Sequence, residues 1–397
     1  MADGRREKKL KMKYLVIGDA GSIFIKQYIE YVLLDPSNEI VLLREGLLNP
    51  NYEEFYQKNG VKVESLWQKK WRFLQNIPRI RSMVGVPLWC RYIKRKYGEF
   101  DCIHIHGVSR SRGDMALQLR KICKRMVVTV WGDELFRYGE RTLARFEKYY
   151  AIADGITVAT KKMYKDFLTV YGEGYRDRLT VNKFAIGLFD RIDVVRREES
   201  REEICRSFGI KHPEKRTVLV GHNGRPAQRH IEITKALSAL PKKYVEEITL
   251  VYTMTYGVAG ESYLEEMIAE SKKIGCDVVV LREFMDENTT ARLRSICDIL
   301  LHAQLTDAFS ASIQESLYSG SIVVNGSWLP YEELPDYRKC MVLYDDVSEL
   351  PVKLAEILDH LEEYREKFAA NQSILRSLSS REVTTKQWRE TLKGIIE

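Results

Sequence analysis

Short apolar runs, several of them ending beside a glycine, recur through the N-terminal half of the chain. They are five or six residues long and lie at residues 13–17, 39–43, 101–106, 126–130 and 155–159. Runs of this length are typical of buried β-strands. Residues 23–32, between the first two runs, place apolar side chains about every 3.6 residues, which predicts a helix. This alternation predicts a parallel sheet covered by helices.

The same pattern restarts after a strongly charged stretch at residues 191–216. Further strands are expected at residues 217–220, 248–252, 277–281, 299–301 and 321–324. A chain of 397 residues is too long for one ordinary core. We therefore expect an α/β protein with two Rossmann-like parallel-sheet domains facing a cleft, the first at residues 12–195 and the second at residues 196–375.

Ligands of such sheets bind beyond the carboxyl ends of the strands, so the glycines there are of interest. Gly18 and Gly21 follow the first strand, but they form only a GxxG pattern. Neither the GxGxxG fingerprint of dinucleotide-binding proteins nor the GxxxxGK[ST] motif of P-loop proteins occurs in the sequence. NAD-dependent dehydrogenases and P-loop NTPases are therefore disfavoured.

Composition is that of an ordinary globular protein, with 30% charged residues. No apolar run approaches the roughly 18–20 residues of a membrane span, and residues 1–13 lack the apolar stretch of a signal peptide. We expect a soluble cytoplasmic protein. The seven cysteines are scattered without a CxxC pair, which argues against a disulfide framework or a zinc site. Most of them should be small buried apolar residues.

Residues 65–97 contain no acidic residue, although they hold nine basic residues and three of the six tryptophans. Tryptophan beside lysine and arginine suits a bilayer interface, and each basic residue near an anionic surface adds about 1 kcal/mol. A plain solvated surface and nucleic-acid binding are the alternatives, but no nucleic-acid motif accompanies the segment. We favour docking on an anionic membrane surface and expect no nucleic-acid partner. The candidate docking residues are Lys69, Lys70, Trp71, Arg72, Trp89 and Arg95.

A candidate anion site lies at residues 221–230, GHNGRPAQRH, where a strand runs into a helix. Backbone amides, the helix N-terminus and the guanidinium groups of Arg225 and Arg229 would meet near one point. Both arginines could bind a phosphate or pyrophosphate with two parallel hydrogen bonds. An ordinary loop with two solvated arginines is the alternative, and the spacing alone does not decide between them.

Residues 307–315, DAFSASIQE, carry two acids beyond the end of an expected strand. Ser310 or Ser312 could cap the helix that follows. Two unconnected surface acids and a hydrolase acid pair are alternatives. A metal pair is less favoured because no DxD accompanies the acids. A ligand clamp fits best: the helix N-terminus meets phosphate, while Asp307 and Glu315 accept hydrogen bonds from hydroxyl groups.

The segment resembles the E-x7-E region of retaining glycosyltransferases of the GT-B fold, family 4 most of all. Their pattern is E-G-F-G-x-x-x-x-E, a small residue with glycine, and an apolar strand. Here Asp307 stands for the first acid, and Ala308 and Ser310 stand for the two glycines. A backbone angle that only glycine tolerates would be strained at those two positions.

The likeness covers most of the chain. It includes the loop from Gly18 to Gly21, the D-hydrophobic-H-x-H strand at residues 101–106, the segment at residues 181–187 and the phosphate-binding loop with Gly224. It also implies that residues 376–397, with Trp388, form a terminal helix packing back on the first domain.

The resemblance implies specific roles in a nucleotide-sugar site. Glu315 would bind the ribose, and Asp307 would lie beside the donor sugar. The pyrophosphate would be held by Arg225, Arg229 and the backbone amides of Phe309, Ser310 and Ala311. Gly18, Gly21 and Gly224 would belong to the donor loops. No metal and no other cofactor is implied.

Trp131-Gly132-Asp133 follows the strand at residues 126–130. Asp133 could contact a sugar hydroxyl and is our second catalytic candidate, and Trp131 could stack on a sugar ring. A core tryptophan followed by a turn is the alternative. His104 and His106 share one face of their strand without further ligands nearby, so we expect packing or polar roles for them rather than metal binding. We count His106 and Trp131 as acceptor-binding candidates.

The WGD tripeptide and GHNGRPAQRHIE look more like bacterial transferases that add 4-acetamido-4,6-dideoxygalactose to a lipid-linked saccharide. The resemblance therefore implies a retaining, metal-independent glycosyltransferase of polysaccharide biosynthesis, peripheral on the inner face of the cell membrane. Its partners would be a nucleotide-sugar donor and a lipid-linked or glycan acceptor. A catalytically degenerate scaffold, suggested by Ala308 and Ser310, and a nucleotide-sugar epimerase are the alternatives.

Overall fold

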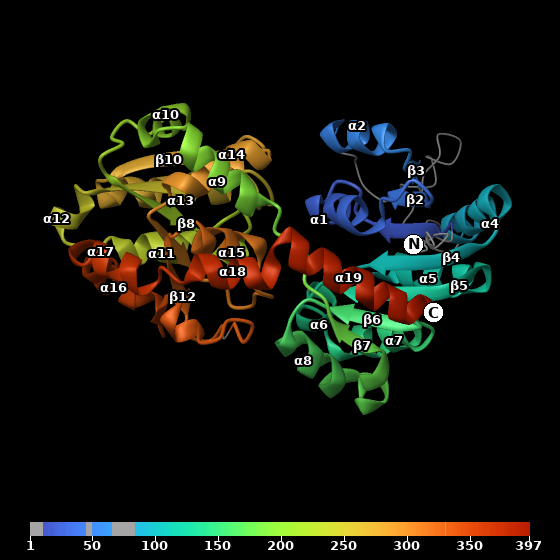
Figure 1. The fold of residues 1–397 in the computed structure, drawn as a ribbon. Helices are drawn as coiled ribbons and strands as arrows, with labels where there is room; N and C mark the ends of the chain where they lie inside the picture. The colour runs from blue at the N-terminus through green and yellow to red at the C-terminus, as the bar shows by residue number, and fades with distance from the viewer. Residues whose placement is uncertain (1–10, 45–49, 66–83, 330) are drawn as a thin grey trace, which may run out of the picture. The chain divides into compact units, whose positions relative to one another are not determined.

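The computed structural model describes the chain apart from residues 1–10, 45–49, 66–83 and 330. The described chain divides into two compact units (Figure 1): Met1–Ala185 with Arg381–Glu397, and Ile186–Ser380. The boundary falls ten residues before the expected one at 195/196. Helix α9 (Leu188–Glu198), expected in the first domain, belongs to the second unit because it packs on α14 (Glu287–Ile296).

The first unit is built on a seven-stranded parallel sheet of order β3-β2-β1-β4-β5-β6-β7. Its strands are β1 (Lys13–Gly18), β2 (Glu39–Arg44), β3 (Lys62–Ser65), β4 (Phe100–His106), β5 (Cys123–Val130), β6 (Gly155–Val158) and β7 (Leu179–Val181). The order reverses between β1 and β4, and ligands of doubly wound sheets bind at such a reversal.

Eight α-helices belong to the described part of the first unit. They are α1 (Ile23–Tyr28), α2 (Pro50–Lys58), α4 (Val86–Tyr97), α5 (Arg110–Leu119), α6 (Asp133–Phe136), α7 (Glu140–Ala151), α8 (Lys161–Tyr171) and α19 (Arg381–Ile396). The helix expected at residues 23–32 forms, but it continues as a π-helix from Ile29 to Leu33.

Terminal helix α19 packs on the first unit, as the resemblance implied. The Trp388 side chain is 2% exposed, and its Nε1 donates to the Lys183 carbonyl at 2.8 Å. The rings of Trp388 and Tyr28 meet edge to face with centroids 5.2 Å apart. Gln387 Nε2 donates to the Val181 carbonyl at 2.7 Å. The last residues of the chain therefore complete the core of the unit that holds its first strand.

The second unit is built on a six-stranded parallel sheet of order β10-β9-β8-β11-β12-β13. Its strands are β8 (Arg216–Val220), β9 (Ile248–Thr253), β10 (Asp277–Leu281), β11 (Ile299–His302), β12 (Ile322–Gly326) and β13 (Val342–Tyr344). Besides α9 and α14, its helices are α10 (Arg201–Ser207), α11 (His230–Leu237), α12 (Lys242–Val245), α13 (Glu261–Ile274), α15 (Ala311–Tyr318), α16 (Leu350–Asp359), α17 (Leu361–Lys367) and α18 (Asn371–Ser379).

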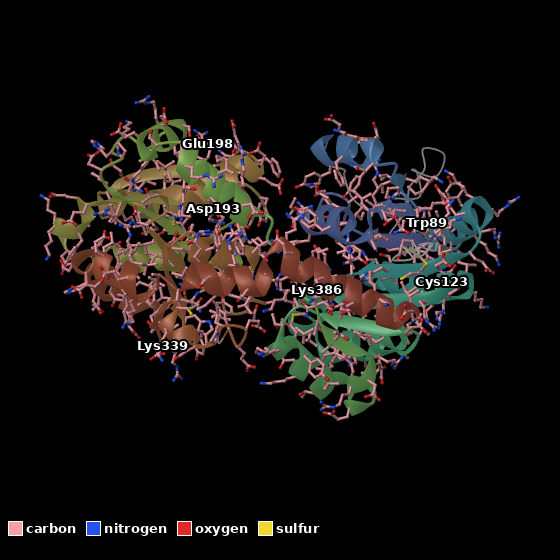
Figure 2. The ribbon with its side chains drawn as sticks, viewed as in Figure 1. Trp89, Cys123, Asp193, Glu198, Lys339 and Lys386 are labelled. Atoms are coloured by element: carbon pink, nitrogen blue, oxygen red, sulfur yellow. The ribbon has the colours of Figure 1, made fainter. Side chains whose placement is uncertain are left out.

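Two acidic side chains, one on α9 and one directly after it, tie this helix to the second unit. Asp193, labelled in Figure 2, binds Arg376 of α18 and accepts a hydrogen bond from the Tyr318 hydroxyl at 2.8 Å. Glu199, just after α9, pairs with Arg292 of α14 at 2.7 Å. These contacts explain why the charged stretch after residue 190 is not the boundary itself.

The α/β fold class with two Rossmann-like parallel sheets is confirmed. Ten of the strands were expected from sequence, and the three that were not are β3, β7 and β13. All three are outer strands of their sheets, and they are three or four residues long. A short strand paired on one side only does not need a continuous apolar run. Its sequence therefore gives little signal.

Candidate functional site

The strand order of the second sheet reverses between β8 and β11. The segments that follow these two strands are the predicted anion loop and the predicted clamp. Gly221, the first residue after β8, has φ 66 and donates its amide to the Leu301 carbonyl at 2.9 Å. The His222 amide donates to Gln228 Oε1 at 3.1 Å, which folds the anion loop back on itself. The fold therefore places both predicted segments at the edge where this class of sheet binds ligands.

A side chain at Gly224 would clash with the loop after β9, which packs directly against this residue. Its amide donates to the Tyr256 carbonyl at 2.9 Å. A Cβ at this position would lie 2.4 Å from Val258 Cγ2 and 3.1 Å from the Tyr256 carbonyl oxygen. The loop after β8 is thus packed against the loop after β9, which fixes the anion loop from one side.

Two residues other than glycine have a positive φ in the described parts of the chain, Arg229 at 60° and Phe309 at 58°. Each lies directly before the first turn of a helix: Arg229 caps α11, and Phe309 precedes the cap of α15. This conformation costs about 1–2 kcal/mol for a residue with a Cβ. Such strain gathers at functional sites, so both residues mark the same region as the sequence motifs do.

The two arginines of the anion loop lie on different sides of it. Arg225 is exposed, and its side chain packs against Gly257 in the loop after β9. Arg229 Nε is 3.6 Å from Glu232 Oε1, a weak contact that leaves most of the guanidinium available. Arg229 also lies within electrostatic range of Asp346, after β13. Two cations therefore flank the loop, in line with the predicted anion site, and they approach it from separate directions.

Asp307 is held by neutral donors on one of its two carboxylate oxygens. The Ser310 amide and the Tyr331 hydroxyl both donate to Asp307 Oδ2 at 2.9 Å. The Tyr331 ring also lies 4.8 Å from the Phe309 ring. Sequence reasoning found Asp307 but missed Tyr331, because nothing in the segment after β12 distinguishes this tyrosine from a core residue.

The strain expected at Ala308 and Ser310 is not found at those positions. Ser310 has φ −56 and ψ 154, and the positive φ falls on Phe309 between them. Ser310 is the residue before α15, but its side chain makes no capping bond, and its Oγ is buried without a hydrogen-bond partner. The first-turn amides of α15 therefore remain available for another acceptor, such as an anion.

Glu315, one turn into α15, forms an ion pair that the sequence did not predict. Arg294 Nε lies 3.1 Å from Glu315 Oε2, and the two side chains are 4% and 12% exposed. Arg294 Nη1 is buried without a partner. An arginine on the otherwise apolar buried face of α14, three residues after Ala291, was the available signal. Glu315 thus meets any ligand as a carboxylate already paired through one oxygen.

Tyr256, in the loop after β9, lies near charged residues of both the anion loop and the clamp. The residue is 54% exposed, while its hydroxyl lies within electrostatic range of Arg225, Arg294 and Glu315. The arginine of the anion loop and the carboxylate of the clamp therefore both lie near Tyr256. Phe284, after β10, and Leu305, after β11, are also exposed apolar side chains, so this sheet edge offers both charge and apolar surface.

Three buried histidines lie at this edge, His222 and His230 in the anion loop and His302 at the end of β11. Burial lowers the pKa of His302 and the pKa of His230, the latter to about 4, and it holds the pKa of His222 well below its usual range. The rings of His222 and His302 stack with centroids 5.6 Å apart. Neutral rings add no fixed charge, so the positive charge at this edge comes from the arginines.

Gly18 and Gly21 belong to the first unit, beside β1. A Cβ on Gly18 would lie 2.9 Å from Ile25 Cδ1 and 3.4 Å from His106 Cβ, so the close packing of α1 and β4 accounts for this glycine. The Gly21 amide donates to Asp19 Oδ1 at 3.0 Å. Their role in donor binding stays a prediction.

His106 ends β4 and is fully buried. Its ring stacks on His104 with centroids 4.0 Å apart, and neither ring nitrogen has a hydrogen-bond partner. His104 bonds to the Tyr28 hydroxyl at 2.6 Å and to Thr129 Oγ1 at 2.7 Å, which confirms a polar packing role. Burial keeps the pKa of both histidines low, at about 3 for His104.

Trp131 and Asp133 follow β5 and differ in exposure. Trp131 is partly buried, and its ring lies 5.2 Å from the ring of Phe184. The Asp133 side chain is 63% exposed and pairs with Arg137 at 3.0 Å. Sequence reasoning missed the next residue, Glu134, which is 3% exposed. Its Oε1 accepts hydrogen bonds from the backbone amides of Trp131 and Val108, at 3.0 Å each. Burial raises the pKa of Glu134.

The basic segment is described only in part, since Lys69, Lys70, Trp71 and Arg72 lie outside the described residues. Within α4, Trp89 is fully buried (labelled in Figure 2), which contradicts the prediction that its ring docks on a membrane. The opposite face of α4 exposes Arg95 together with Arg91 and Lys94. Within α4, a buried apolar face and an exposed basic face account for the mixed composition.

Among the described residues, no helix combines the length and apolarity of a membrane span. In the same residues, no group of three or more His, Cys, Asp or Glu side chains is arranged to hold a metal ion. The seven cysteines are free thiols, and five of them are buried, as expected for apolar packing residues.

Comparison with known proteins identifies solved structures but no sequence family. The chain matches no protein-family model and no curated protein sequence. HepE from Anabaena, solved in complex with UDP, has a TM-score of 0.73 at 14% identity, covering 96% of this chain and all of HepE. A glycosyltransferase from Rickettsia africae has the same TM-score and identity, with 98% and 99% coverage. A UDP-GlcNAc 2-epimerase from Neisseria meningitidis, bound to UDP-GlcNAc, has a TM-score of 0.64 at 14% identity, covering 96% of this chain and all of the epimerase.

These matches agree in architecture across nearly the whole chain. The two parallel-sheet units have the α/β fold of GT-B glycosyltransferase structures. At such low identity the likeness carries the fold and not the chemistry. The residues at the β8–β11 edge therefore have to support any statement about function.

Proposed function

We propose that this protein is a glycosyltransferase that moves a sugar from a nucleotide-sugar donor to an acceptor hydroxyl. One observation carries the proposal: the anion loop and the clamp follow the two strands at which the strand order of the second sheet reverses. Arg229 and Phe309, the two residues with a left-handed backbone conformation, lie there at the starts of α11 and α15. Cations and helix amides suit a diphosphate, and carboxylates suit hydroxyl groups.

The donor would lie across the carboxyl ends of β8 and β11. Its diphosphate would be bound by Arg225, Arg229 and the amides at the start of α15. Asp307 would accept a hydrogen bond from the sugar through Oδ1, for which the described residues provide no partner. The ribose would bind to Glu315, whose Oε2 is paired with Arg294 at 3.1 Å. This assignment gives the two acids different ligands, as the resemblance implies.

Transfer would break the bond between the sugar C1 and the leaving diphosphate and form a bond from C1 to the acceptor oxygen. The acceptor proton would pass to the leaving diphosphate, so atoms and charge balance without a protein nucleophile. Fixed positive groups at the diphosphate lower the barrier because they stabilise the charge that develops there. Arginines and amides supply that charge, so we propose a metal-independent reaction. Retention of configuration is part of the proposal and rests on the resemblance.

Assay of a donor panel tests the proposal. The chain is incubated with UDP-, GDP- and dTDP-sugars, and binding is followed by thermal shift. Transfer is then measured with a radiolabelled donor and a lipid-linked saccharide, with and without EDTA. We expect one donor to bind and to be turned over in the presence of EDTA. Binding of no nucleotide-sugar would instead favour a degenerate scaffold.

Epimerisation is the second candidate function, because an epimerase bound to UDP-GlcNAc is among the similar structures. The two reactions differ in their need for an acceptor. A transferase releases free nucleoside diphosphate only slowly without an acceptor and returns no isomer of the donor. Chromatography of the donor after incubation without acceptor separates them, since an epimerase would yield a second nucleotide-sugar.

A lipid-linked acceptor would require the enzyme to work at the membrane, and we propose that the exposed face of α4 docks there from the cytoplasm. Arg91, Lys94 and Arg95 are exposed. At about 1 kcal/mol each, replacing all three by Gln should weaken binding to anionic vesicles roughly 100-fold. Co-sedimentation measures this. The matched control replaces Lys211, Lys242 and Lys272, also exposed, and should bind as the wild type does. Equal loss in both triple variants would reduce the effect to net charge.

A further inference from the structure

We propose that Tyr331 is a positioning residue, which holds Asp307 so that only Oδ1 of its carboxylate faces the donor sugar. This inference rests on the proposed function and adds to it the residue that orients the sugar-binding acid. Tyr331 lies after β12, a strand that contributes no residue to the site predicted from sequence.

The hydrogen-bond geometry accounts for one carboxylate oxygen completely. Asp307 Oδ2 accepts two hydrogen bonds of 2.9 Å, from the Tyr331 hydroxyl and from the Ser310 amide. Two donors on one oxygen fix the carboxylate plane, because rotation about the Cβ–Cγ bond would break both bonds. Oδ1 has no hydrogen bond or ion pair with the described residues. The free oxygen of the acid is therefore held in one direction.

Burial makes the Tyr331 hydroxyl a dependable donor. The residue is 3% exposed, and its ring packs on Phe309. Burial and the nearby Asp307 charge hold the pKa of Tyr331 well above its usual range, so the phenol keeps its proton. A protonated phenol beside a carboxylate can only donate to it. No ion pair engages Asp307 in the described chain, so its position depends on these two neutral donors.

The same contact also supports the strained backbone at the start of α15. Phe309, at φ 58, is 4% exposed, and Gln314 Nε2 donates to its carbonyl at 2.8 Å. The Tyr331 ring packs against the Phe309 ring, and the Tyr331 hydroxyl donates a hydrogen bond to Asp307. One residue thus orders both the acid and the turn that presents the α15 amides. A pre-ordered site needs no reorganisation when charge develops during transfer.

Y331F is the test, because it removes one oxygen atom and keeps the ring against Phe309. The matched controls are Y344F and Y318F. Tyr344 is buried and donates to the His302 carbonyl at 2.9 Å, and Tyr318 is buried and donates to Asp193 at 2.8 Å. One control removes a hydroxyl near the site, and the other removes a tyrosine–aspartate bond elsewhere in the same unit.

Three quantities are measured for each variant: kcat for transfer, KM for the nucleotide-sugar, and the Kd for UDP alone. We expect kcat of Y331F to fall about tenfold, which corresponds to about 1.4 kcal/mol. KM and the UDP Kd should stay within about twofold, because the diphosphate contacts are intact. Both control variants should keep the wild-type kcat.

Other results would overturn the inference in distinguishable ways. Wild-type kcat in Y331F would remove Tyr331 from the reaction while leaving the proposed function in place. Parallel loss of UDP binding and thermal stability in Y331F would make Tyr331 a purely structural residue. Absence of turnover in the wild-type chain on every donor would overturn the proposed function and, with it, the role of Tyr331.

Discussion

Replacing Arg229 by glycine or by alanine separates the strain of its backbone from the charge of its side chain. Arg229 has φ 60 and ψ 39, which costs a residue with a Cβ about 1–2 kcal/mol and costs glycine almost nothing. R229A removes the guanidinium and keeps the strain, whereas R229G removes both. The comparison of the two variants isolates the backbone contribution.

The expected difference in stability follows from these contributions. Relief of strain favours R229G by about 1–2 kcal/mol, and the greater freedom of glycine in the unfolded chain offsets about 0.5–1 kcal/mol. The contact with Glu232 at 3.6 Å is lost in both variants and cancels. R229G should therefore be more stable than R229A by about 1 kcal/mol in urea unfolding, or about 2–4 °C in Tm.

Loss of the guanidinium should affect UDP in the same way in both variants. A charge-assisted hydrogen bond contributes about 1.5–3 kcal/mol, so the Kd for UDP should rise about 10- to 100-fold. Isothermal titration calorimetry measures it, with R206A, an exposed arginine of α10, as the control. Equal stability of R229A and R229G would refute the strain argument. A Kd within twofold of the wild type would refute the phosphate role.

Three further predictions concern the same unit. G224A should weaken UDP binding and destabilise the fold by about 1–3 kcal/mol, because its Cβ would lie 2.4 Å from Val258 Cγ2. Adding V258A to the same chain should restore part of the UDP affinity and part of the stability, which UDP titration and urea unfolding measure. R294M should cost about 3–5 kcal/mol of unfolding free energy by leaving Glu315 buried and unpaired, whereas R292M, which breaks a more exposed pair, should cost less. Wild-type stability should fall as the pH drops from 6.5 toward 4. The buried histidines have a lowered pKa and stay neutral, whereas the same histidines bind protons in the unfolded chain. H230Q should remove roughly 3 kcal/mol of that fall, since the folded pKa of His230 is about 4; urea melts at several pH values measure the slope, and an unchanged slope would contradict the assignment.

The strands that position the site could be predicted because they are central in their sheets. β8 and β11 are buried central strands built around the apolar runs Val218–Val220 and Ile299–Leu301, and the chain after them contains Arg225, Asp307 and Glu315. The edge strands β3, β7 and β13 could not be predicted, since pairing on one side leaves their composition free. Local apolar pattern therefore identifies the central strands and the edge strand β10, whose sequence is a run of apolar residues, but not the shorter edge strands.

The partners of the predicted acids could not be found from sequence, because they come from other elements. Tyr331 lies 24 residues after Asp307, and Arg294 lies 21 residues before Glu315. The turn at Phe309 shows a related limit. The resemblance placed glycines at positions 308 and 310, yet the left-handed residue is the one between them. Which residue of a turn carries the unusual angle depends on packing, here against Tyr331.

Membrane docking shows how burial corrects a prediction from composition. The tryptophans of residues 65–97 suggested an interfacial surface, but Trp89 on α4 is fully buried. The arginines and lysine on the other face of α4 keep the electrostatic part of that prediction open to test.

Hydrogen exchange with and without UDP tests the central claim most directly, because it reports where the nucleotide binds. We predict that UDP slows exchange at the amides of residues 221–230 and 309–313, with little change elsewhere in the second unit, and that R229A loses this protection at the same UDP concentration. Binding of UDP with protection confined to other segments would contradict the assignment of the donor site to the β8–β11 edge.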